Sequence, residues 1–293
     1  SLGLGFDVLT GINPNIIVAD SSALGSSGPL SRSMGYGPLV RASCGLTWLW
    51  RYPEIDGSFS DSTTIIPDHF AARVSATAIA ALLIRRHHNG GGGSVSVSQA
   101  ETILAALGAE FLRESLQPGS FVPTGNQYAY DAPNNVFCCA GDDEWCIVAV
   151  RNSQDWQQLC VAMKKEYLAA DSRYASAEGR LAHRDELEQQ VAQWTASRTP
   201  YEVMETLQKL GVPAGNMQRL DEYERNPHFM ARQFFRKLDQ PGLPAPILTE
   251  NAPVGFSHLP VPALRPAPFL AQHTEEIAQQ LFGLSASEIA ELA

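Results

Sequence analysis

The sequence predicts an α/β protein, because short apolar strands alternate with longer helical segments across short joints. Residues 15–20 form an apolar run entered from Asn13-Pro14, which is typical of a buried strand. Residues 94–98 alternate serine and valine and indicate a second, short strand. A long helical pattern lies between the two, so strand, helix and strand follow one another as in a crossover unit.

The helices of this first region are predicted from apolar periodicity and from their end signals. We expect one helix or a broken helix at 36–50, a long helix at 69–88 and another at about 99–114. The pattern of 69–88, large apolar residues among alanines, predicts a buried helix. The glycines at 90–93 follow that helix and lack the Lys-Ser/Thr of a phosphate loop, so they indicate a helix-ending turn with positive φ.

Composition changes after residue 117, where Pro, Gly, Asn and Tyr become frequent and predict a linker. A hairpin is expected at about 135–150, around a turn at 141–143. The following helices are expected at 153–169, 183–197 and 200–210, with a short strand after a turn at 211–215. Residues 239–268 are rich in proline and predict an extended connector, and two closing helices are expected at 273–282 and 285–292.

These elements predict four parts. We expect a large domain over residues 1–118, a linker over 119–137, a small α/β domain over 138–240, and a C-terminal connector with helices over 241–293 that return to the large domain. The chain does not begin with methionine, so we expect a processed chain or a fragment.

Charge and composition exclude several classes of function. The net charge of -10 argues against a nucleic-acid surface, and no apolar run is long enough to span a bilayer. The five cysteines are odd in number and form no Cys-x-x-Cys pair, which argues against a disulfide framework or a zinc site. We expect reduced core cysteines in a cytoplasmic protein.

Asp68 is the residue that the sequence singles out, in Pro67-Asp68-His69 at the start of the long helix. Aspartate is a favoured N-cap, and the positive end of the helix dipole would keep its carboxylate ionised and aimed. Most aspartates at helix starts only cap, so a structural role stays open. Other motifs give less: His87 and His88 are adjacent and cannot face one ligand on a helix, and no Gly-x-Ser-x-Gly elbow is present.

Several segments, in order along nearly the whole chain, resemble the family III CoA-transferases, also called the CaiB/BaiF family. The matching positions are residues 13–17, 24–29, 35–36, 42–46, 67–69, 80–82, 85, 90–99, 211–215, 226–229, 265–268 and 273–274. The resemblance implies a Rossmann-like large domain, a small α/β domain, and two chains that interlock in a dimer.

The resemblance also implies an enzyme that moves coenzyme A between carboxylic acids, with CoA as a substrate and without a metal. Asp68 matches the family's aspartate nucleophile, and Tyr36 matches a position that lines the acyl site. The match of the family's glycine-rich loop to Gly125, Asn126 and Gln127 is loose. Arginines suit CoA phosphates or an acyl carboxylate, although any single one can instead form a surface ion pair. The candidates are Arg32, Arg41 and Arg73.

Two departures from the family keep alternatives open. Only the tail of the family's first nucleotide-binding segment is present, so we expect a homodimer or a partner chain that supplies this segment, and a catalytically silent partner half remains an alternative. Gly37 stands where transferases often have an acidic residue, which weakens acid–base help there. A racemase or dehydratase is a weaker alternative, because Tyr36 replaces the histidine that related racemases use.

Overall fold

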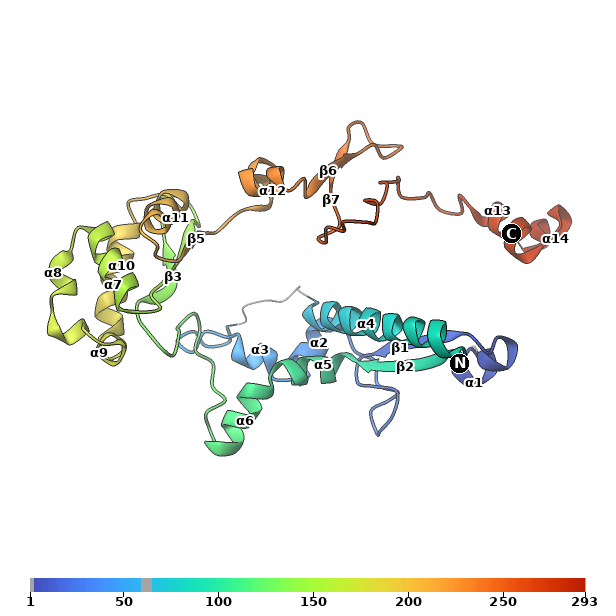
Figure 1. Cartoon of the computed structure of the whole chain (residues 1–293), viewed down its shortest axis with the longest axis horizontal. Helices are drawn as coiled ribbons and strands as arrows, with labels where there is room; N and C mark the ends of the chain where they lie inside the picture. Colours follow the sequence, from blue (N-terminus) through green and yellow to red (C-terminus); the bar gives the residue numbers. More distant parts are fainter. Residues whose placement is uncertain (1–2, 59–64, 293) are drawn as a thin grey trace. The chain divides into compact units, whose positions relative to one another are not determined.

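The computed structural model describes residues 3–58 and 65–292, and Figure 1 shows the chain. It forms two compact units, Ser1–Asn216 and Met217–Ala293, which are described separately. The observed elements confirm a mixed α/β architecture. None of the helices in the described part is long and apolar enough to cross a membrane.

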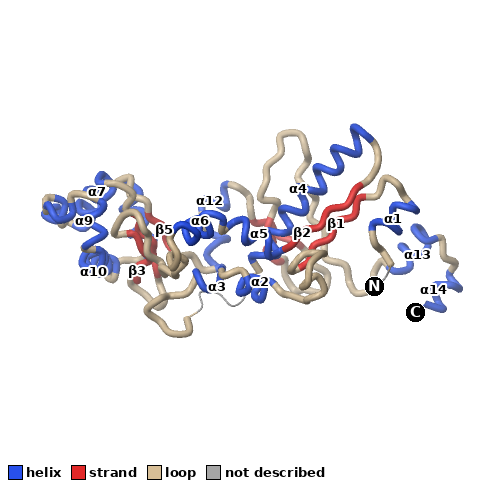
Figure 2. The backbone as a smooth tube through the Cα atoms, turned by 90° about the horizontal axis from the view of Figure 1, so that it is seen from below, coloured by secondary structure: helices blue, strands red, loops and turns tan. Residues whose placement is uncertain are grey.

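The first unit contains a parallel pair of strands, β1 (Ile17–Ser22) and β2 (Gly93–Ser98). Their register runs from Ile17 opposite Gly93 to Ser22 opposite Ser98. The long helix α4 (Ile66–Asn89) joins them and packs along both strands, as Figures 1 and 2 show. This is the predicted strand–helix–strand crossover.

Short helices complete this region around a small apolar core. They are α1 (Phe6–Ile12), α2 (Gly37–Ser43), α3 (Leu46–Leu49), α5 (Gln99–Ala106) and α6 (Gly108–Leu116). The core comprises Ala23, Val40, Cys44, Leu46, Ala100, Ile103 and Leu107. Gly45, at φ 79°, separates α2 from α3, so the broken form of the predicted helix is the one that occurs.

The second region of the first unit is a three-stranded sheet covered by helices. Its order is β3 (Asn134–Cys138), β4 (Trp145–Ala149) and β5 (Ala214–Asn216), all antiparallel, which confirms the predicted hairpin. The helices are α7 (Ser153–Met163), α8 (Glu166–Ala169), α9 (Ala177–Ala182), α10 (Arg184–Thr195) and α11 (Pro200–Lys209). Their core includes the fully buried Leu159, Tyr174, Leu187, Val203 and Leu207.

The unit Met217–Ala293 holds smaller elements. They are η2 (Leu220–Arg225), α12 (Pro227–Ala231), β6 (Phe235–Leu238), β7 (Ile247–Glu250), α13 (Thr274–Phe282) and α14 (Ala286–Leu292). The antiparallel pair β6–β7 corrects the prediction that residues 239–268 are only an extended connector. Tyr223, Phe229, Phe234 and Phe235 pack edge to face or tilted around this hairpin.

Three further expectations change. Lys164, at φ 57°, ends α7 and splits the single helix predicted for 153–169. Leu107 separates α5 from α6 within the helix predicted for 99–114. The prediction that helix α4 is buried is wrong for the described part of the chain: of its residues only Pro67 and Ala71 are buried. The proposed domain limits stay a prediction.

The cysteines are all free thiols. Four are buried and Cys138 is exposed, so the expectation of core cysteines fails at that one position. Burial raises the pKa of the Cys160 thiol to about 12, which keeps this thiol protonated and unreactive at neutral pH.

Candidate active site

The local structure around Asp68 corrects its expected position in the helix. Helix α4 begins at Ile66, its N-cap is Ile65, and no side chain caps it. Pro67 is tolerated inside the first turn, because an amide there has no intrahelical acceptor to lose. Asp68 is therefore the third helical residue, not the N-cap, although it remains in the first turn near the positive end of the dipole.

The two carboxylate oxygens of Asp68 have different surroundings. Gln99 Nε2 donates a hydrogen bond of 2.9 Å to Oδ1. Oδ2 is buried, and within residues 3–58 and 65–292 it has no hydrogen-bond partner. Gln99 Oε1 is also buried and has no hydrogen-bond partner among these residues. Among the described residues, one oxygen is thus held by Gln99 while the other accepts no hydrogen bond.

Gly37 lies directly against this carboxylate. A Cβ built on Gly37 would overlap Asp68 Oδ2 and would come within 2.9 Å of Ile65 Cα. Only glycine permits this approach without a shift of α4 or of the carboxylate. Tyr36 is the residue just before Gly37, so its backbone is close to Asp68, while its side chain is 77% exposed.

The site lies at the carboxyl end of the parallel strands. Gln99 is the first residue after β2, and α4 starts in the connection that follows β1. Open α/β sheets bind ligands at this edge, because helix N-termini and strand ends converge there. The pairing of Asp68 with Gln99 was not predicted, and the position of Gln99 directly after a predicted strand was the signal that could have indicated it.

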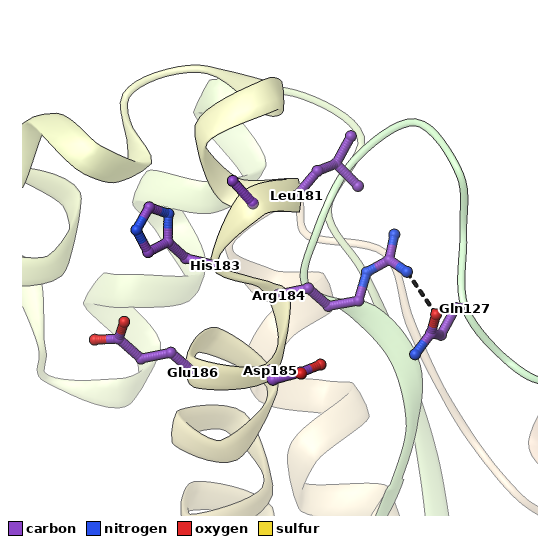
Figure 3. A pocket seen from close by; sticks show the side chains of 7 residues that line it. Gln127, Leu181, His183, Arg184, Asp185 and Glu186 are labelled. Carbon is purple, nitrogen blue, oxygen red and sulfur yellow. Dashed lines mark hydrogen bonds between the residues drawn. The ribbon is translucent and has the colours of Figure 1, made fainter. Parts of the chain in front are cut away.

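The predicted substrate loop lies close to Tyr52 and Pro53 at Gly125 and is hydrogen-bonded at Gln127. Gly125 has φ 59°, and a Cβ built there would lie 3.4 Å from Tyr52 Cδ1 and 3.5 Å from Pro53 Cδ. Asn126 is exposed. Gln127 Oε1 accepts a hydrogen bond of 2.7 Å from Arg184 Nη1, as Figure 3 shows. No hydrogen bond among the described residues joins this loop to Asp68.

Gln127 also lines an open polar hollow of about 540 Å³ at the junction of α9 and α10. The other lining residues, drawn in Figure 3, are Leu181, Ala182, His183, Arg184, Asp185 and Glu186. Arg184 also donates from Nη2 to the carbonyl oxygen of Tyr128 at 2.5 Å. This arrangement fixes the end of the loop.

The three candidate arginines do not form a cluster joined by described interactions. Arg32 is exposed. Arg73 is exposed on α4 and donates to the carbonyl oxygen of His69 at 2.8 Å. Arg41 is only 3% exposed, and its Nε donates to Thr47 Oγ1 at 3.1 Å. Arg41 is thus engaged inside the protein, and the roles proposed for all three stay predictions.

Comparisons with known proteins bear on this geometry. The family model "CoA-transferase family III" matches residues 1–274. A probable CoA-transferase of Mycobacterium tuberculosis is 39% identical over 293 residues, a match that covers 98% of this chain and 37% of the relative. The succinyl-CoA–D-citramalate CoA-transferase of Chloroflexus aurantiacus is 29% identical, with 99% of this chain and 71% of the relative covered.

A solved structure shows the same fold. It is a CaiB/BaiF family protein from Brucella suis, with a TM-score of 0.81 and 24% identity, and the match covers 95% of this chain and 71% of that one. The present chain spans little more than a third of the length of the mycobacterial relative. Because the family model covers most of the sequence, the chain belongs to the family III CoA-transferases.

Proposed function

We propose that the chain takes part in the transfer of coenzyme A between carboxylic acids, with Asp68 as the nucleophile. The observation that carries this proposal is the Asp68 carboxylate itself, which Gln99 holds by Oδ1 while Oδ2 lacks a partner among the described residues. Its place at the carboxyl end of the β1–β2 pair, in a chain of this family, supports the same role.

In the first half of the proposed reaction, a carboxylate oxygen of Asp68 attacks the thioester carbonyl of the acyl-CoA. The carbon–sulfur bond breaks, CoA leaves as a thiolate, and an aspartyl–acyl anhydride forms. The thiolate then attacks the Asp68 carbonyl carbon. The acyl group leaves as a carboxylate that takes one oxygen from Asp68, and Asp68 becomes a thioester of CoA.

In the second half, the acceptor carboxylate attacks the aspartyl thioester and again releases the CoA thiolate. The thiolate attacks the acceptor carbonyl of the new anhydride, which gives the product acyl-CoA. Asp68 is restored as a carboxylate, now with one oxygen from the acceptor. Each nucleophilic addition passes through an oxyanion, and the first-turn amides of α4, such as that of Ile66, have no intrahelical acceptor and can donate to it.

The first test replaces the nucleophile. We expect Asp68→Asn to lower the transfer rate by at least about 1,000-fold, because an amide oxygen is a poor nucleophile. Asp7→Asn is the matched control, since Asp7 is an exposed first-turn aspartate of α1. Transfer between acid pairs is measured for both variants by separation of the acyl-CoA products. Full activity of Asp68→Asn contradicts the proposal.

Oxygen-18 in the acceptor carboxylate tests the proposed path directly. After several turnovers the label should appear in the peptide that contains Asp68, because the acceptor leaves one oxygen there. Mass spectrometry of the digested protein measures the shift. Active enzyme without label at Asp68 rules out the anhydride route.

A further inference from the structure

A second polar feature lies on the same unit and has no role in the proposed chemistry. The guanidinium carbon of Arg51 lies 3.7 Å from the ring centroid of Trp48, which is a close stacking distance. The ring itself is oriented, because Trp48 Nε1 donates to the carbonyl oxygen of Phe121 at 3.3 Å. Trp48 therefore provides a fixed flat surface beneath a planar cation.

The Nε of this guanidinium has no hydrogen-bond partner in the part of the chain that the structure describes. Arg51 is half-buried, its Nε is fully enclosed, and within residues 3–58 and 65–292 no acceptor meets that Nε. No carboxylate in this described part forms an ion pair with Arg51. The two terminal nitrogens, Nη1 and Nη2, carry the other N–H donors of the guanidinium group.

Other half-buried or buried arginines of the chain differ in this respect. Arg180 forms a bidentate pair with Asp131. Arg198 also stacks on a tryptophan, with its guanidinium carbon 4.8 Å from the Trp194 ring, but it donates to the carbonyl oxygen of Trp194. Arg51 instead stacks by its face on Trp48, and its Nε meets no acceptor among the described residues.

The surroundings connect Arg51 to the predicted substrate loop. The next two residues, Tyr52 and Pro53, are the ones nearest to Gly125, and Ser58 Oγ bonds both the amide and the carbonyl of Tyr52 at 2.9 and 3.0 Å. The backbone that carries Arg51 is thus fixed beside this loop. A planar fork prefers two-oxygen partners, namely carboxylates and phosphates.

We propose that Arg51, stacked on Trp48, binds an oxyanion of the acyl-CoA substrate through its terminal nitrogens. The oxyanion is either the distal carboxylate of a dicarboxylic acyl group or a phosphate of CoA. The existence of the anion site rests on the geometry, and the identity of its ligand rests on the proposed function.

The test is calorimetric binding of two ligands of equal chain length, glutaryl-CoA and pentanoyl-CoA, to the full chain carrying Asp68→Asn, which removes turnover. We expect Arg51→Gln to weaken binding by ~10- to 100-fold, the usual effect of a lost charge-assisted hydrogen bond. A loss confined to glutaryl-CoA assigns the site to the carboxylate. An equal loss for both ligands assigns it to a CoA phosphate.

Two further variants serve as controls for this binding measurement. Arg198→Gln removes a stacked arginine of the other region and should leave both affinities unchanged. Arg51→Lys keeps the charge without the fork and should recover part of the loss, and it replaces Arg51→Gln if that variant fails to fold. Unchanged binding of both ligands to Arg51→Gln and Arg51→Lys, or no binding to the chain with Arg51 intact, overturns the proposal. These titrations need no covalent step, so failure of the Asp68 mechanism is distinguishable from failure of this site.

Discussion

The two regions of the first unit use similar apolar sequences with different results. In the β3–β4–β5 region, Leu159, Leu187 and Leu207 are fully buried at 0% exposure. In the β1–β2 region, Ile84 on α4 is 62% exposed, and α4 has little buried surface for a helix of 24 residues. The difference lies in what packs against each sheet. Helices cover the β3–β4–β5 sheet and close a core, whereas β1 and β2 pair with no further strand within the described residues.

This contrast shows that helical periodicity predicts which face of a helix is apolar, not whether another layer covers that face. Parallel strands are normally buried on both faces, and a two-stranded parallel sheet provides little area for packing. The stability of the first unit should therefore depend mainly on the β3–β4–β5 region. Three pairs of substitutions probe the packing of the β3–β4–β5 region, and one of these pairs compares it with α4.

The largest effect is expected at the buried ion pair of the well-packed region. Arg180 Nη2 lies 2.6 Å from Asp131 Oδ2, and the two side chains are 1% and 4% exposed. Arg180→Met would leave the Asp131 carboxylate buried without its partner, at a cost of about 3–5 kcal/mol in the free energy of unfolding. Urea unfolding measures this cost.

Its control is the pair Lys209–Glu205, in which the two side chains are 69% and 49% exposed. Lys209→Met should cost less than about 1 kcal/mol, because solvent screens an exposed pair. Equal costs for the two variants would show that the Arg180–Asp131 pair is hydrated in solution.

The next effect compares one leucine from each region. Leu159→Ala should destabilise the protein by about 2–5 kcal/mol, because it leaves a cavity in a closed core. Leu83→Ala should cost about 1 kcal/mol or less, since Leu83 is 42% exposed on α4. Chemical unfolding of both variants decides the comparison. A large cost at Leu83 would mean that another chain or segment covers α4 in solution.

The smallest effect concerns Glu188 on α10. Burial raises the pKa of this carboxyl, Asn135 Nδ2 donates to its Oε2 at 2.8 Å, and Oε1 is buried without a partner in the described structure. Because the pKa is raised in the folded state, the contribution of Glu188 to the free energy of unfolding is fully present below its unfolded pKa. The contribution is lost as the pH rises through the folded pKa.

Glu188→Gln should therefore raise Tm slightly at neutral pH, and the gain should vanish below the ordinary glutamate range. Thermal unfolding across pH measures this. Glu205→Gln on α11 is the control, because Glu205 is 49% exposed and its pair with Lys209 is a surface pair. A gain for Glu188→Gln that persists in acid would contradict the titration argument.

Local patterns predicted much of the fold but less of the site. The strand–helix–strand crossover and the hairpin follow from periodicity and turn residues, which act over a few neighbours. The β6–β7 pair was missed because the proline-rich sequence around residues 239–268 hides the short strand that ends at Glu250. The burial of α4 was predicted wrongly because it depends on whether elements distant in the sequence pack against the helix.

The same limit applies to Asp68. Its place at the start of a helix was evident from Pro67, but its partner was not, because Gln99 lies 31 residues away in the sequence. Arg41 likewise gave no sign in the sequence that it is buried. Hydrogen bonds between distant elements depend on the fold and leave no fixed spacing for a single sequence to reveal.

The glycine run at residues 90–93 has a consequence for insertions and deletions. Gly92 N–H donates to the carbonyl oxygen of Pro14 at 2.8 Å and Gly93 N–H to that of Ile16 at 3.0 Å, so the run sets where β2 begins against β1. Loss or gain of one glycine would shift β2 by one residue and turn each of its side chains to the opposite face. A flexible linker would tolerate such a change in length. Here the same change would alter the environment of every side chain of β2 at once.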